Sequence, residues 1–160
     1  MNDTGPVGPP PDHANVVVLP PILVGGTFAI GLIAHALWPF ALTGRWLRPT
    51  GGALVAASLL LAAWSAITLV RFKTAVIPHH VTTRIVSTGP FRLSRNPIYL
   101  GMLAAYVGGS LLVTSAWPLL LFPAVALVLH HGVVRREEAY LARKFGDEYR
   151  RYTETVRRWL

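Results

Sequence analysis

Long apolar runs separated by short polar segments dominate this chain. Residues 16–40 and 51–70 each form a run long enough to cross a bilayer core, which takes about 20 apolar residues in a straight helix. Two shorter runs, residues 98–114 and 117–131, are joined by a Ser- and Pro-containing stretch that favours a tight turn. The pattern predicts an all-α, polytopic membrane helical bundle with four transmembrane helices.

A different periodicity follows after residue 134. Apolar side chains recur there at steps of three and four, which is typical of one face of a helix. They are Leu141, Phe145, Tyr149, Tyr152, Val156 and Trp159. Gly146 is expected to break the helix into two pieces. The opposite face carries Arg143, Lys144, Arg150, Arg151, Arg157 and Arg158. We therefore predict a C-terminal amphipathic cytoplasmic helix whose basic face suits anionic lipid.

The remaining regions complete the predicted domain organisation. Residues 1–15 are rich in Pro and Gly and predict a disordered leader. Residues 16–160 are expected to form a single membrane-embedded domain. Its longest polar loop begins near Arg71 and ends at Pro97, and a loop of that length is often functional.

Composition and charge agree with a membrane protein. Charged residues make up 14% of the chain, against about 25% in a typical soluble domain. The net charge of +8 could suit nucleic acid, but the cations flank the apolar runs. With the N-terminus in the cytoplasm, Arg45 and Arg48 are the only two of the fifteen Lys and Arg residues outside. This asymmetry predicts a bacterial inner-membrane protein with both termini cytoplasmic, and no nucleic-acid partner.

The start of the third apolar run carries candidate chemistry. Asn96 followed by Pro97 is typical of a helix N-cap and first turn. The amides of such a helix start can bind an anion, and Gly101 allows close approach of a ligand or a neighbouring helix. The same residues are also compatible with a simple capped helix start beside a basic loop.

Two adjacent carboxylates, Glu137 and Glu138, follow the fourth apolar run. An ionisable pair next to a membrane span is a candidate binding site for an amino group, a ribose hydroxyl or a sulfonium. The alternative is a solvated helix end whose acids are neutralised by Arg135 and Arg136.

Neither cysteine nor histidine suggests a metal centre. The chain has no cysteine, which excludes disulfides, thiolate metal ligands and a cysteine nucleophile. Its paired histidines, His79-His80 and His130-His131, are adjacent residues that rarely bind one metal together. No His-Glu-x-x-His motif accompanies them, so we predict no metal site.

Taken in order, these motifs resemble one known superfamily. Gly89-Pro90-Phe91-Arg92 precedes Arg95-Asn96-Pro97-x-Tyr99-x-Gly101, and Glu137-Glu138-x-x-Leu141 precedes Phe145-Gly146-x-x-Tyr149-x-x-Tyr152 and a closing Arg158-Trp159. This pattern resembles the isoprenylcysteine carboxyl methyltransferase and phospholipid methyltransferase superfamily over about residues 71–160. The resemblance implies an all-helical membrane enzyme that binds S-adenosylmethionine on its cytosolic side.

The resemblance also implies site residues. Those expected to contact the cofactor are His79, His80, Arg84, Ile85, Val86, Phe91, Asn96, Pro97, Tyr99, Gly101 and Glu137. Glu138 is a candidate base for an amine acceptor. His131 and Arg135 are candidates to replace a substrate-binding arginine that the isoprenylcysteine enzymes carry where this chain has Val133.

Two departures from the family pattern bear on the acceptor. Asn96 stands where the eukaryotic isoprenylcysteine enzymes have histidine, and Val133 stands in place of their arginine. Methylation of prenylated proteins is therefore disfavoured, and the acceptor is expected to be a lipid-soluble or amphipathic carboxylate, amine or thiol.

Two other functions fit parts of the pattern. NADPH-dependent membrane reductases of the sterol and enone type share a similar Arg-x-Pro-x-Tyr-x-Gly motif, but usually follow it with Glu where this chain has Met102. A non-catalytic membrane scaffold would share the hydropathy without needing the paired motifs. The oligomeric state stays open.

Overall fold

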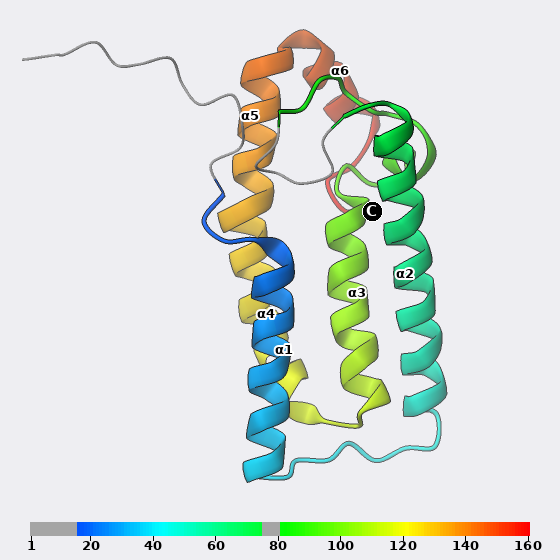
Figure 1. The fold of residues 1–160 in the computed structure, drawn as a ribbon, viewed down its shortest axis with the longest axis vertical. Helices are drawn as coiled ribbons and strands as arrows, with labels where there is room; N and C mark the ends of the chain where they lie inside the picture. Colours follow the sequence, from blue (N-terminus) through cyan, green and yellow to red (C-terminus); the bar gives the residue numbers. More distant parts are fainter. Residues whose placement is uncertain (1–15, 75–80) are drawn as a thin grey trace, which may run out of the picture.

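Four helices whose axes lie side by side form the body of the protein in the computed structural model, and successive helices run in opposite directions (Figure 1). The structure describes residues 16–74 and 81–160. The helices are α1 (Pro20–Leu37), α2 (Leu47–Arg71), α3 (Pro97–Leu112) and α4 (Ala116–Leu129). A 3-10 turn, η1 (Gly89–Arg92), precedes α3. A π-helical turn, η2 (His130–Val134), continues α4 into α5 (Arg135–Phe145), and α6 (Asp147–Thr155) follows. The predicted leader, His79 and His80 lie outside the described residues.

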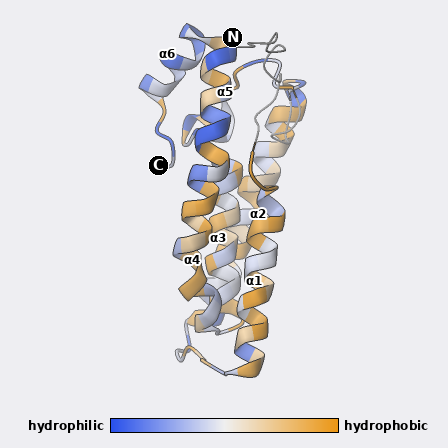
Figure 2. Ribbon diagram, turned by 90° about the vertical axis from the view of Figure 1, so that its left-hand side faces the viewer, coloured by the Kyte–Doolittle hydropathy of each residue, from blue (hydrophilic) through white to orange (hydrophobic). Residues whose placement is uncertain are grey.

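The apolar length of the helices confirms a membrane helical bundle. α1, α2 and the continuous helix Ala116–Phe145 are long and apolar enough to cross a bilayer. α3 is apolar but has only 16 residues, so the fourth predicted span stays a prediction. Hydrophobic colouring runs along all four helices, whereas α5 and α6 are largely polar (Figure 2). In residues 16–74 and 81–160 no strand forms apart from an isolated bridge between Ala41 and Ser115.

Glycines bring α2 and α3 into close contact. A Cβ atom on Gly51 would lie 2.5 Å from the carbonyl oxygen of Gly108, and a Cβ on Gly101 would lie 3.2 Å from the carbonyl oxygen of Ser58. Small residues allow this approach, which is how helices commonly associate in membranes, where apolar side chains gain little by leaving lipid. This contact fixes the position of the start of α3.

We expect Gly51→Ala to lower the melting temperature of the detergent-solubilised protein by several degrees. The added methyl group would meet the backbone of α3, and overpacking of this kind costs about 1–3 kcal/mol. Gly52→Ala is the matched control, because the nearest atom to its Cβ is the end of the Leu112 side chain at 3.8 Å. Equal melting temperatures for the two variants would contradict this account of the α2–α3 contact.

The π-helical turn joins the membrane-spanning part to the polar end of the molecule. Its Gly132 carbonyl accepts a hydrogen bond from the Val17 amide at 3.1 Å, which ties the chain before α1 to this turn. Val133 and Val134 are fully buried. π-turns inside α-helices are rare and frequently lie at functional sites, and this one directly precedes the helix that carries Glu137 and Glu138.

The predicted break of the C-terminal helix at Gly146 is confirmed. Gly146 has φ of +51°, a conformation that glycine adopts at little cost, and it separates α5 from α6. The apolar face packs inward, because buried Tyr149, Tyr152 and Val156 contact Ile85 and Leu141. The predicted basic face needs one correction. Arg158 does not belong to it, since its guanidinium turns inward to Glu138.

Candidate active site

A cavity lies at the polar end of the bundle, where η1, the start of α3, α5 and α6 meet. The cavity has a volume of about 90 Å³, and the space reaches about 660 Å³ when its mouth, which opens to solvent, is included. The described residues that line it are Leu69, Thr74, Thr82, Arg84, Ile85, Val86, Phe91, Arg95, Asn96, Pro97, Ile98, Tyr99, Glu137, Leu141, Tyr149 and Tyr152. Ligand pockets commonly enclose 300–1,000 Å³, so a nucleoside-sized ligand would need the mouth as well as the interior.

A hydrogen bond between the two sequence motifs lies in the wall of this cavity. The Tyr99 hydroxyl on α3 donates to Oε2 of Glu137 on α5 at 2.7 Å. Tyr99 is buried, and its ring belongs to the core cluster that also contains Leu129 and Val133. The bond therefore holds the Glu137 carboxylate in a fixed position beside the cavity.

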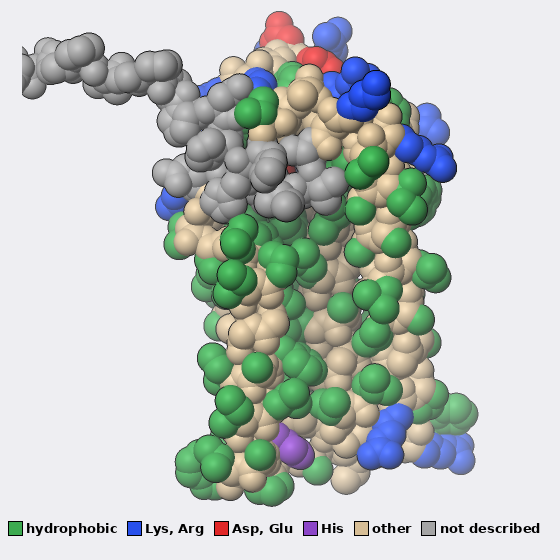
Figure 3. All heavy atoms as spheres, viewed as in Figure 1, with side chains coloured by type: hydrophobic (Ala, Val, Ile, Leu, Met, Phe, Trp, Pro, Cys, Tyr) green, Lys and Arg blue, Asp and Glu red, His purple; other side chains and the backbone are tan. Residues whose placement is uncertain are grey.

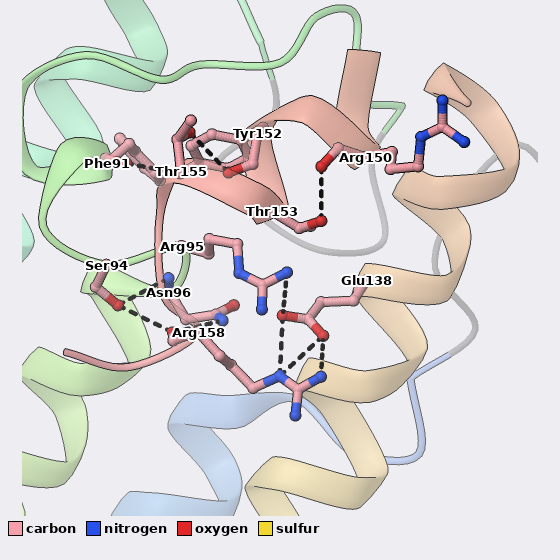
Figure 4. A network of polar contacts seen from close by, with 10 residues as sticks. All are labelled: Phe91, Ser94, Arg95, Asn96, Glu138, Arg150, Tyr152, Thr153, Thr155 and Arg158. Carbon is pink, nitrogen blue, oxygen red and sulfur yellow. Dashed lines mark hydrogen bonds and ion pairs between the residues drawn. The ribbon is translucent and has the colours of Figure 1, made fainter. Parts of the chain in front are cut away.

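The second carboxylate has different partners. Glu138 accepts two hydrogen bonds from Nε of Arg158, at 2.9 and 3.1 Å, and its Oε2 lies 2.7 Å from Nη2 of the same side chain. Nη1 of Arg95 lies 3.5 Å from its Oε1. Arg95 and Arg158 both point toward Glu138 in Figure 4. The hydrogen bond to Glu138 raises the pKa of Arg158.

The loop before α3 and helix α6 close one side of the cavity. The Tyr152 hydroxyl donates to the carbonyl of Phe91 at 2.7 Å, and the Thr82 amide donates to the Tyr140 hydroxyl at 3.4 Å. Burial, with a smaller contribution from the charge of Glu138, raises the pKa of Tyr149 to about 12. Tyr149 therefore stays a neutral phenol at cellular pH, and the cavity wall that it forms carries no phenolate charge.

An apolar groove lies on a neighbouring face of α3. Its lining is almost entirely hydrophobic and comes from α2, α3, α4 and the two residues His130 and Trp159. The apolar members are Leu54, Leu100, Leu103, Ala104, Val107, Phe122, Ala126 and Leu127. The rings of His130 and Trp159 lie 6.1 Å apart at the end of the groove that is closest to the polar part of the protein.

Comparison with known proteins decides the family. The sequence profile of the phospholipid methyltransferases matches residues 46–148, well over half of the chain. The chain belongs to the phospholipid methyltransferase family. An uncharacterized protein of Haemophilus influenzae is 48% identical over an alignment of 58 residues, which covers 31% of this chain and 92% of that protein. The family assignment shows that this is a membrane methyltransferase in general terms and confirms the superfamily resemblance.

Most of the predicted cofactor contacts line the cavity. They are Arg84, Ile85, Val86, Phe91, Asn96, Pro97, Tyr99 and Glu137. Gly101 does not line it, because the bare face of this glycine is turned toward Ser58 and Ala62 of α2. We therefore assign Gly101 to helix packing.

The three predicted catalytic residues lie outside the cavity lining. Both oxygens of Glu138 accept hydrogen bonds from Arg158, which disfavours this carboxylate as a base. His131 and Arg135 are exposed, and Nη1 of Arg135 lies 3.4 Å from Nδ1 of His131. None of the three is positioned to act on a ligand inside the cavity as it is formed here.

One local prediction and one alternative interpretation of the sequence need correction. Asn96 precedes α3 as predicted, but its side chain forms no cap bond to that helix and donates instead to the Arg158 carbonyl at 3.1 Å. The Glu137-Glu138 pair has more distant partners than the alternative of neutralisation by Arg135 and Arg136 supposes. Glu137 is bound by Tyr99, and Glu138 is bound by arginines from two other parts of the chain.

Several cavity residues were missed by sequence reasoning. Arg95, Tyr149 and Tyr152 all belong to the motifs that carry the family resemblance, but the sequence pattern assigns none of them a role in the site. Their position inside the motifs was the available signal. Thr74 and Thr82 lie at the two ends of the loop before η1, where the Thr83 amide donates to Thr74 Oγ1 at 3.1 Å, and nothing in the local sequence marks them.

Proposed function

We propose that this chain uses S-adenosylmethionine to methylate a lipid-soluble or amphipathic acceptor through a carboxylate, amine or thiol. The observation that carries the proposal is the Tyr99–Glu137 hydrogen bond, because it joins the two motifs of the family resemblance at one cavity. Family membership supports methyl transfer over NADPH-dependent reduction and over a non-catalytic scaffold.

The chemistry of the cavity fits the cofactor. S-adenosylmethionine combines an adenosine, an ammonium, a carboxylate and a sulfonium, and when bound it supplies an electrophilic methyl group. Glu137 offers a carboxylate to the ammonium or a ribose hydroxyl, and Arg95 offers a guanidinium to the carboxylate. Ile85, Val86 and Phe91 offer apolar surface to the base. Arg95 lines the cavity, and its buried Nε has no hydrogen-bond partner within residues 16–74 and 81–160.

The remaining work of the protein is positioning. Methyl transfer from a sulfonium needs an in-line approach and exclusion of water, so a fixed cavity wall contributes more than proton transfer does. A carboxylate or thiolate acceptor would need no base. This is consistent with the engagement of Glu138 by two arginines.

The apolar groove supports a lipid acceptor. It opens among the apolar faces of α2, α3 and α4, where only hydrocarbon chains would be in contact with it in a bilayer. His130 and Trp159 place a polar and an amphipathic ring at the end nearest the cofactor cavity. A lipid whose tail lay in the groove would present its polar end toward that cavity.

The distribution of charge supports an inner-membrane location with both termini cytoplasmic. Acidic side chains on the face shown in Figure 3 gather at the α5–α6 end, together with many basic ones. Arg45 and Arg48 lie at the opposite end, at the start of α2. The positive-inside rule then assigns the α5–α6 end, and the cavity with it, to the cytosol.

Methyl transfer can be tested with the purified protein in membranes. Labelled S-adenosylmethionine, tritiated in its methyl group, should transfer tritium into the extracted bacterial lipid fraction, and NADPH should not be oxidised under the same conditions. Mass spectrometry of lipids with and without the protein would then identify the acceptor by a gain of one methyl group. Oxidation of NADPH without tritium transfer would reject the proposal.

A further inference from the structure

The last residues of the chain lie across the start of α3. After α6 ends at Thr155, residues 156–160 form neither helix nor strand. The Arg95 amide donates to the carbonyl of Arg157 at 3.0 Å. The Ser94 hydroxyl and the Asn96 side-chain amide both donate to the carbonyl of Arg158 at 3.1 Å. Ser94 and Asn96 are buried, so this C-terminal segment satisfies polar groups of the cofactor motif itself (Figure 4).

The side chain of Arg158 competes with Arg95 for one carboxylate. Arg158 engages both oxygens of Glu138, whereas Arg95 reaches only Oε1, through Nη1 at 3.5 Å. The side chains of Arg95 and Glu138 are only 13% and 11% exposed, so the charges interact in a medium that screens them weakly. Without Arg158, Glu138 would have Arg95 as its remaining cationic partner and would draw it into a full ion pair.

Arg95 is the member of this cluster that lines the cavity. One carboxylate is shared by two guanidinium groups, so the cluster of three side chains keeps one net positive charge. Nε of Arg95 is buried and lacks a hydrogen-bond partner among the described residues, and an unsatisfied buried donor is costly. The lining holds two arginines, Arg84 and Arg95, and one carboxyl group, that of Glu137. Of these, Glu137 and the largely buried Arg95 form a pair of opposite charge. That pair is complementary to the ammonium and the carboxylate of an amino acid.

We infer that Arg158 is a positioning residue that occupies Glu138 and thereby keeps Arg95 available for the carboxylate of the methyl donor. The inference rests on the proposed function, because the anion is the carboxylate of the amino-acid part of S-adenosylmethionine. Arg158 itself is not among the described residues that line the cavity. Its carbonyl accepts hydrogen bonds from Ser94 and Asn96, and its guanidinium donates to Glu138.

Binding of S-adenosylhomocysteine, measured by isothermal titration calorimetry on the full chain in detergent, tests this role. Arg158→Ala should weaken binding about tenfold, the order expected when a charge-assisted hydrogen bond to the ligand is lost. Arg157→Ala is the matched control, because it removes the same charge from an exposed side chain next door, and it should change the affinity less than about twofold. Binding of methylthioadenosine, which lacks the amino-acid part, should be unaffected in both variants.

The double variant Glu138→Ala/Arg158→Ala separates positioning from folding. Removing the competing carboxylate frees Arg95 again, so the double variant should bind S-adenosylhomocysteine more tightly than Arg158→Ala alone. A merely structural role predicts the opposite, since a second loss in the same cluster would add to the first. Further weakening in the double variant, or equal weakening of methylthioadenosine by Arg158→Ala, would overturn the inference. Absence of S-adenosylhomocysteine binding by the unmodified protein would instead reject the proposed function.

Discussion

Glu137→Ala is expected to abolish measurable binding of S-adenosylhomocysteine, with a loss of affinity of at least about 100-fold. The substitution removes the carboxylate that Tyr99 holds in the cavity wall, and it leaves the Tyr99 hydroxyl without its partner. Both changes act on the same wall of the cavity. Isothermal titration calorimetry on the solubilised protein measures the effect directly.

Two further variants test whether the effect comes from the charge of Glu137 at this position. Glu137→Gln preserves an acceptor for the Tyr99 hydroxyl and removes only the charge, so it should fold normally and bind weakly. Glu154→Ala removes an exposed carboxylate from α6 and should leave the affinity unchanged. Unchanged affinity in Glu137→Ala, with the protein folded, would disprove the assignment of this cavity to the cofactor.

Ala104→Trp is expected to reduce methyl transfer to lipid at least about tenfold while leaving S-adenosylhomocysteine affinity unchanged. Ala104 lines the apolar groove and lies outside the cofactor cavity, so the indole would fill space that an acceptor chain needs. The measurement is tritium transfer from labelled S-adenosylmethionine into lipid, with cofactor binding followed in parallel.

The control for this prediction is the same alanine-to-tryptophan substitution at an exposed position of a membrane-spanning helix, outside the groove. Ala63 is exposed on α2 and does not line the groove, so Ala63→Trp should transfer methyl groups at the normal rate. Loss of transfer in both variants would point to a general disturbance of the bundle. Normal transfer in Ala104→Trp would show that the acceptor does not use the groove.

The helices of the bundle could be predicted because their signal is local. The hydrophobic composition of a run is enough to predict that it forms a helix embedded in lipid. Asn96-Pro97 marks the start of α3 because proline is favoured at the first position of a helix. The break at Gly146 is local for the same reason. The extent of α3, Pro97–Leu112, likewise agrees closely with the apolar run predicted at residues 98–114.

The partners of the charged side chains could not be predicted in the same way. The Asn96 side chain binds a carbonyl 62 residues away, and Glu138 binds an arginine 20 residues away. Arg135 lies three positions before Glu138, a spacing at which helix side chains can meet, yet the arginines that Glu138 binds are Arg95 and Arg158. These contacts depend on where the C-terminal segment folds back, which no local pattern encodes.

The unequal lengths of the helices that leave the turn at residues 113–115 set the depth of the cavity. α3 rises about 24 Å from that turn, whereas the continuous helix Ala116–Phe145 rises about 45 Å. The start of α3 therefore lies beside a helix that continues further in the same direction. If the turn lies at one surface of a hydrocarbon layer about 30 Å thick, the start of α3 lies about 6 Å short of the opposite surface. A thicker bilayer would place the start of α3 deeper below the membrane surface, so we expect the rate of the proposed methyl transfer to depend on membrane thickness.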